Sequence, residues 1–165
     1  MRLGDRIPLA CRTHMVNSLG AIRTSSTDAF VTASGTAMQL YSPHSGTQFL
    51  KVEQHSPTFD VPENGWKDVP SLDAVATLSG DGRKLFLHLL NLDPAQSMSV
   101  RIRLDGQAVD PAGEVWQLAP DDFLAQNYFG AANVAVEHHP LSGAGAEFTQ
   151  VLPPHSATTL ELKVK

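Results

Sequence analysis

Histidine and cysteine side chains are the groups of this sequence that could bind a metal ion, and the chain has seven histidines and one cysteine. His138 and His139 are adjacent, and neighbouring residues of a strand point to opposite faces, so their imidazoles cannot easily share one ion. Four further histidines fall in separate predicted turns or strands: His44, His55, His88 and His155. Since Cys11 also stands alone, the ligand spacing of a zinc site is absent. We predict surface or hydrogen-bonded histidines, with no metal and no cofactor.

Carboxylates could instead act as a pair in glycoside hydrolysis, which needs two of them about 5 to 5.5 Å apart for retention and further apart for inversion. The candidates fall in predicted turns or loops: Glu63, Asp68, Asp73, Asp81, Asp121 and Asp122. Acidic residues are common in turns without any catalytic role, so we assign none of them to catalysis. A nucleophile elbow is also absent, because the nearest strings, LSGDG and LSGAG, are typical turns.

Two tryptophans, Trp66 and Trp116, could stack on sugar rings. A lone tryptophan in a strand such as EVWQL is more often part of the core, which is the interpretation for Trp116. Trp66 lies in the proline-flanked loop VPENGWKDVP and is the better candidate for an exposed contact.

Charge and hydropathy exclude several partners. The net charge is -5, whereas binding to a nucleic-acid backbone requires a concentrated cationic surface. No apolar run approaches the ~20 residues of a membrane helix. Arg2 and Arg6 are not followed by the apolar region and cleavage site of a signal peptide, and Cys11 cannot form an internal disulfide. We therefore expect a cytoplasmic protein that binds neither nucleic acid nor membranes.

The elements that would position these side chains are mostly strands. From about Thr47 onward, short apolar runs alternate with Gly, Pro, Asp and Asn, which is typical of an antiparallel β-sandwich. The strongest hairpin signal is AVATLSGDGRKLFLHLLNL, whose two apolar runs flank the turn at residues 79–82. Further strands are predicted in SVRIRLDG, AGEVWQLA, NVAVEHHP, AEFTQVLPPHS and TTLELKVK, while DFLAQNYFGAAN is expected to be irregular.

Residues before Thr47 do not fit this pattern. A short helix is expected around Gly35 to Ser42, ended by Pro43 and Gly46. The run PLACRTHMVNSLGAIRT, residues 8–24, has apolar residues on successive positions, as in a strand buried on both faces or a buried helix. Such a run needs neighbours, so on its own it would fold back on the sandwich, self-associate or fray.

Several strings, in order along the chain, resemble the C-terminal portion of α-L-arabinofuranosidases of glycoside hydrolase family 51. They are DRIPLACRTHMVNSLGAIRTS, AMQLYSPHSG, SPTFDVP, DVPSLDAVATLSGDGRKLFLHLLNLDP, EVWQL and PPHSATTLEL. The resemblance implies a catalytic (β/α)8 barrel followed by a jelly-roll-like β-sandwich. It further implies a retaining hydrolase of terminal arabinofuranosyl groups, with one Glu as acid/base and another as nucleophile.

By this resemblance, residues 1–46 are the last barrel strand and helix, and residues 47–165 are the accessory sandwich. His14 takes the place of a substrate-contacting Gln at the strand's C-terminal end, where barrel active sites lie, although a packed, hydrogen-bonded histidine is an equal alternative. Asn17 in the same run and Trp66 are further substrate-binding candidates. Both catalytic glutamates lie upstream in the family, and no Asn-Glu pair occurs here.

We therefore expect a chain that is inactive alone, whose partner is an arabinofuranosidase barrel or subunits of its own type. The alternatives are a free-standing carbohydrate-binding module and a protein-interaction domain.

Overall fold

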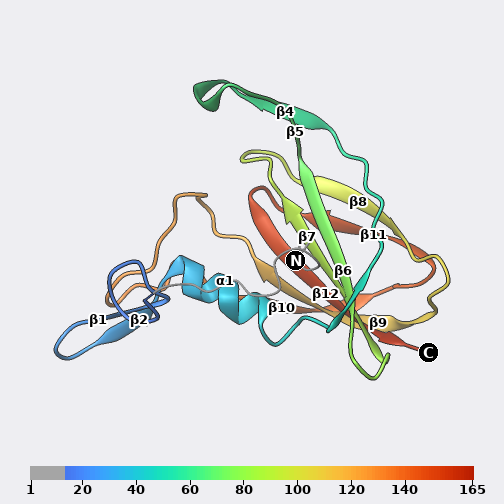
Figure 1. Cartoon of the computed structure of the whole chain (residues 1–165), viewed down its shortest axis with the longest axis horizontal. Coiled ribbons are helices and arrows are strands. Elements are labelled where there is room, and N and C mark those ends of the chain that lie inside the picture. Colours follow the sequence, from blue (N-terminus) through green and yellow to red (C-terminus); the bar gives the residue numbers. More distant parts are fainter. Residues whose placement is uncertain (1–13) are drawn as a thin grey trace.

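A six-stranded antiparallel sheet forms the larger layer of the molecule (Figure 1). The computed structural model describes residues 14–165. The strand order is β10-β9-β12-β7-β6-β3, so the C-terminal strand β12 lies near the centre. The strands are β3 (Gln48–Leu50), β6 (Leu72–Leu78), β7 (Lys84–Asn91), β9 (Val109–Leu118), β10 (Glu137–Ser142) and β12 (Ser156–Val164).

A two-stranded antiparallel sheet forms the second layer, from β8 (Met98–Arg103) and β11 (Glu147–Leu152). The core lies between the two layers because alternate residues of each strand point inward. Its members come from both sheets and include Leu87, Ile102, Val115, Leu152 and Leu160. The mainly β, antiparallel sandwich predicted from the sequence is therefore confirmed.

The predicted hairpin is formed by β6 and β7, which pair from Leu72–Asn91 to Leu78–Leu85. The turn closes with a hydrogen bond of 2.8 Å from the Ser79 amide to the Lys84 carbonyl. Gly82 has φ of +72°, a conformation that L side chains rarely adopt, which is why glycine suits this turn.

A second hairpin projects from the sandwich and carries Trp66 (Figure 1). It consists of β4 (Thr58–Val61), the 3-10 turn η1 (Pro62–Asn64) and β5 (Trp66–Pro70). Trp66 is exposed on this arm, with 60% of its surface accessible. The prediction that Trp66 is exposed is confirmed, but its placement in a loop is wrong, because Trp66 begins strand β5.

The helix predicted around Gly35 to Ser42 is present as α1 (Ala33–Tyr41). Thr32 caps its N-terminus, because the Thr32 hydroxyl accepts the Gly35 amide at 3.2 Å. Gly35 also lies against the chain before the helix, where an added Cβ would come within 2.3 Å of the Ala21 carbonyl oxygen. The helix therefore packs so closely on the chain at Ala21 that only glycine fits at position 35.

The chain before the helix forms a small hairpin of β1 (Ile22–Thr24) and β2 (Ala29–Val31). Of the run 8–24, residues 8–13 lie outside the described residues. The expected burial is wrong for residues 14–19, which are exposed, while Gly20 and Ala21 are buried. Positive φ angles at His14, Asn17 and Ser18 bend the chain into turns, so this part of the run is no buried strand.

The stretch from 119 to 136 is irregular and runs beside the β1–β2 hairpin (Figure 1). The irregular structure predicted for residues 122–133 is confirmed, whereas the strand predicted in NVAVEHHP begins only at Glu137, as β10. Buried Asn127 fixes it there. The Asn127 Nδ2 donates to the Val31 and Val134 carbonyls, both at 2.9 Å, and its Oδ1 accepts the Val134 amide at 2.7 Å. The rings of Phe30 and Phe129 pack edge to face at 4.9 Å. Residues 14–41 and 119–136 therefore pack together, and we call them the hairpin–helix unit.

Candidate functional site

A row of polar and aromatic side chains crosses the face of the large sheet that points away from the core. Register pairs join His138 on β10 to Trp116 on β9, Trp116 to Thr159 on β12, and Thr159 to His88 on β7. Their strand neighbours Val115 and Leu160 belong to the core, so this row occupies the opposite face. We call it the polar row.

Trp116 lies at the centre of an aromatic stack in this row. The His44 ring lies 4.1 Å from its ring at an interplanar angle of 25°, and the His138 ring lies 4.0 Å away on a parallel plane within 12°. The indole nitrogen of Trp116 is buried and has no hydrogen-bond partner among residues 14–165. The prediction that Trp116 is part of the sandwich core is wrong, because it lies on the outer face between two imidazoles.

Two glutamates join this stack to the strands beneath. Glu161 accepts hydrogen bonds from Lys84 Nζ at 2.5 Å and from His44 Nδ1 at 3.2 Å, and Glu114 contacts His138 Nε2 at 2.6 Å. Burial raises the pKa of Glu161, but the hydrogen bonds from Lys84 and His44 outweigh it and hold that pKa below its usual value. The same contact raises the pKa of Lys84.

Glu114 and Glu161 are direct register partners on neighbouring strands, a pair that our sequence reasoning did not consider. A general acid needs a raised pKa, whereas Glu161 is held ionised. The pair is therefore a charge network that holds the polar row together, and it does not have the features of a catalytic carboxylate pair. The alternation of Glu114 and Trp116 with core residues along β9 was the available signal.

His88 is the buried histidine of the polar row, with 4% of its surface accessible. Its Nδ1 lies 3.0 Å from the Thr159 hydroxyl and its Nε2 lies 3.5 Å from the Thr77 hydroxyl. The Tyr41 ring of α1 covers it edge to face at 5.5 Å. Burial lowers the pKa of His88 to about 4, so the ring is neutral near pH 7.

The acidic candidates from the sequence are distributed over the molecule. Asp68 and Asp73 lie in strands β5 and β6, so the loop prediction is wrong for these two. The other candidates lie in turns, bends or η1: Glu63, Asp81, Asp121 and Asp122. Within residues 14–165, no group of three histidine, cysteine or acidic side chains could hold a metal ion.

The three substrate-binding candidates are not brought together. His14 and Asn17 lie in the exposed turn before β1, far from Trp66 on the β4–β5 arm (Figure 1). Both polar atoms of the Asn17 side chain contact Thr24, with Oδ1 accepting the Thr24 amide at 2.8 Å and Nδ2 donating to its hydroxyl at 2.9 Å. Asn17 thus has a structural contact in the turn.

Large apolar side chains are exposed on the hairpin–helix unit. Phe123 and Leu124 expose 63% and 67% of their surfaces. Six others are exposed on the same unit: Met15, Val16, Leu19, Met38, Tyr128 and Phe129. Apolar groups gathered in this way on one unit are typical of a surface that contacts another protein or domain.

These features define the class: an antiparallel β-sandwich domain with an appended hairpin–helix unit. Residues 1–156 match the family model of the alpha-L-arabinofuranosidase C-terminal domain, and the chain belongs to this family. The resemblance predicted from the sequence is confirmed. No curated protein matches the chain. Among the described residues, no helix is long and apolar enough to cross a membrane.

Solved structures extend this likeness over nearly the whole chain. The alpha-L-arabinofuranosidase from Thermotoga maritima, in an arabinose complex, is 28% identical with a TM-score of 0.89, over 98% of this chain and 35% of that chain. The thermostable family 51 α-L-arabinofuranosidase from Thermotoga petrophila is 28% identical with a TM-score of 0.88, over 97% of this chain and 35% of that chain. AbfB, a family 51 enzyme from Bifidobacterium longum, is 27% identical with a TM-score of 0.79, over 96% and 31%. This chain therefore spans about a third of the length of these enzymes.

Proposed function

We propose that this chain is the accessory part of an α-L-arabinofuranosidase and that it works against a catalytic (β/α)8 barrel. In this proposal residues 1–46 complete the barrel and residues 47–165 form the accessory sandwich. His14 and Asn17 would then lie at the sugar. A cytoplasmic location stays a prediction from the lone Cys11.

The exposed apolar side chains of the hairpin–helix unit carry this proposal. Phe123 and Leu124 are exposed in the segment 119–136. Asn127 in the same segment donates a hydrogen bond to the Val31 carbonyl of β2. Strand β2 belongs to residues 1–46, the part that would complete the barrel. Covering apolar surface from water stabilises a contact by about 25 cal/mol for each Å². A barrel seated on this unit would therefore stabilise both parts.

The chain alone is expected to hydrolyse no arabinofuranoside, because the resemblance places both catalytic glutamates upstream of it. The measurement is release of the aryl alcohol from an aryl α-L-arabinofuranoside by the purified chain. The full-length Thermotoga maritima enzyme at the same molar concentration is the positive control. Turnover above a buffer blank that follows the chain through purification would contradict the proposal.

Exposure of Trp66 favours a second function, a carbohydrate-binding module. An exposed indole on a projecting arm offers a flat apolar face to the C–H groups of a sugar ring. Free ligand at about ten times its Kd would stabilise the folded chain by about 1.4 kcal/mol, which is about 3 to 5 °C in Tm.

In a thermal melt with arabino-oligosaccharide, Trp66→Ala is then expected to lose most of this rise. Phe49→Ala is the matched control, since Phe49 is a half-exposed aromatic residue on β3. An equal rise in both variants would show that Trp66 is not the contact.

A further inference from the structure

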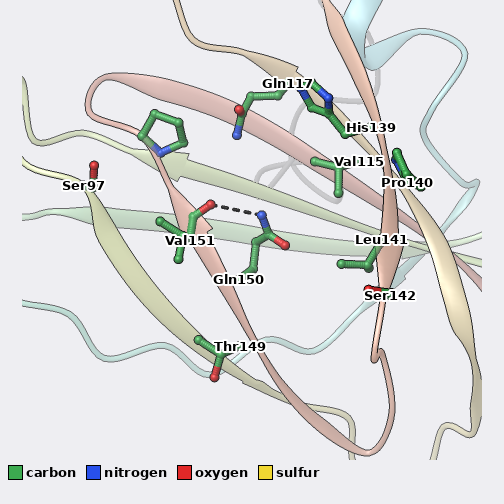
Figure 2. Close-up of a pocket in the computed structure, with 11 residues that line it drawn as sticks. Ser97, Val115, Gln117, His139, Pro140, Leu141, Ser142, Thr149, Gln150 and Val151 are labelled. Atoms are coloured by element: carbon green, nitrogen blue, oxygen red, sulfur yellow. Dashed lines mark hydrogen bonds between the residues drawn. The ribbon is translucent and has the colours of Figure 1, made fainter.

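The sandwich is open along one side, between β10 of the large sheet and β11 of the small sheet. Both are edge strands of their sheets. A cavity of about 400 Å³ lies between them, and Figure 2 shows side chains of both sheets around it. We call it the edge groove. Its size falls within the range of small-molecule sites in proteins.

Polar side chains occupy inward-facing positions of this groove. Gln117 follows Val115 on the inner face of β9, His139 precedes Leu141 on that of β10, and Gln150 lies between two inward residues of β11. Val115 and Leu141 belong to the core, so apolar residues would be the stable choice at the neighbouring positions. Three polar side chains from three strands converge instead.

These side chains keep hydrogen-bonding capacity for a ligand. Gln117 Nε2 donates to the Thr158 hydroxyl at 2.9 Å, and Gln150 Nε2 donates to the Val151 carbonyl at 3.0 Å. Within residues 14–165, no hydrogen bond engages the Oε1 of either glutamine or the Nδ1 of His139. An inward-facing polar atom lowers the stability of the folded chain unless water or a ligand completes its hydrogen bonds.

We propose that the edge groove binds a small neutral polyhydroxylated molecule, of the size of one or two sugar rings. Its acceptors are the free amide oxygens of Gln117 and Gln150, which suit ligand hydroxyl groups. Ser97, in the loop before β8, also lines the groove, and its hydroxyl can both donate and accept a hydrogen bond.

The apolar lining of the groove and the charge beside it further restrict the class of ligand that it can bind. Val115 and Leu141 supply apolar surface for the C–H groups of a ring. The Glu137 carboxylate, 3.2 Å from His139 Nε2, disfavours an anionic ligand beside it. None of the residues lining the groove belongs to the hairpin–helix unit or to the β4–β5 arm.

The test is an NMR titration of the full chain with L-arabinose, D-xylose and, as an anionic sugar, D-galacturonate. We expect saturable shifts of the Gln117 and Gln150 side-chain amides with a neutral sugar, and weaker binding of galacturonate. Gln150→Val is expected to weaken binding by about five- to tenfold, since one hydrogen bond is worth about 1 kcal/mol. His139→Leu is a second groove variant.

Gln48→Val is the matched control, because Gln48 is an exposed glutamine on β3 at the other edge of the sheet, and it is expected to leave binding unchanged. No saturable shift at tens of millimolar neutral sugar overturns the proposal. So do shifts confined to the β4–β5 arm, tighter binding of galacturonate, or equal binding by Gln150→Val. None of these outcomes involves hydrolysis, so they leave the arabinofuranosidase assignment untouched.

Discussion

Replacing Leu160 by alanine is expected to lower the free energy of unfolding by about 3 kcal/mol. Leu160 is fully buried on β12, which lies between β9 and β7, and its register partners are Val115 and Leu87. Both belong to the core, so the cavity left by the lost methyl groups would be surrounded by strands that are paired on both sides. The surroundings of such a cavity relax little, so the loss of unfolding free energy is large.

Urea unfolding at neutral pH measures this loss as a shift in the midpoint with an unchanged slope. Lys163→Ala on the same strand is the control, because Lys163 is exposed and its truncation leaves the core intact. A loss below about 1 kcal/mol for Leu160→Ala would mean that the two sheets do not close on β12 as described.

Acid is expected to destabilise the chain through His88 by about 3 kcal/mol. The pKa of His88 is about 4 in the folded chain and about 6.5 when unfolded, so between these values the unfolded chain binds more protons. The contribution of the neutral ring is therefore complete above pH 6.5, falls as the pH drops from 6.5 to 4, and is constant below 4.

The measurement is the free energy of unfolding in urea at pH 7, 5.5 and 4.5 for the wild type and for His88→Gln. We expect the wild type to lose stability over this window and the variant to lose about 2 to 3 kcal/mol less. His55→Gln is the control, because His55 is an exposed histidine. Parallel losses in the wild type and His88→Gln would show that the ring of His88 is not buried neutral.

The strands could be predicted because their information is local. The alternation of Val100 and Ile102 with Arg101 and Arg103 assigns the two faces of β8, and the glycines at 80 and 82 mark the β6–β7 turn. The irregular structure of residues 122–133 was also predicted, since this stretch lacks periodicity.

The polar row could not be predicted because it depends on the order of strands in the sheet. His138, Trp116 and His88 meet only because β10, β9, β12 and β7 are neighbours, although β12 is the last strand of the chain. His44 reaches Glu161 across 117 positions of sequence. The residue pattern of a single strand does not indicate which other strands lie beside it. The edge groove has the same origin, since Gln117, His139 and Gln150 come from three strands.

The two outer strands of the large sheet also bear on how the molecule behaves at high concentration. An exposed strand edge can pair with the edge of another copy and begin a continuous intermolecular sheet. Here β3 is only three residues long, and β10 contains Pro140, which has no N–H to offer a further strand. Three exposed polar side chains, Glu137, His138 and His139, keep β10 hydrated. Both edges of the large sheet are thus unfavourable templates for pairing with a strand of another copy.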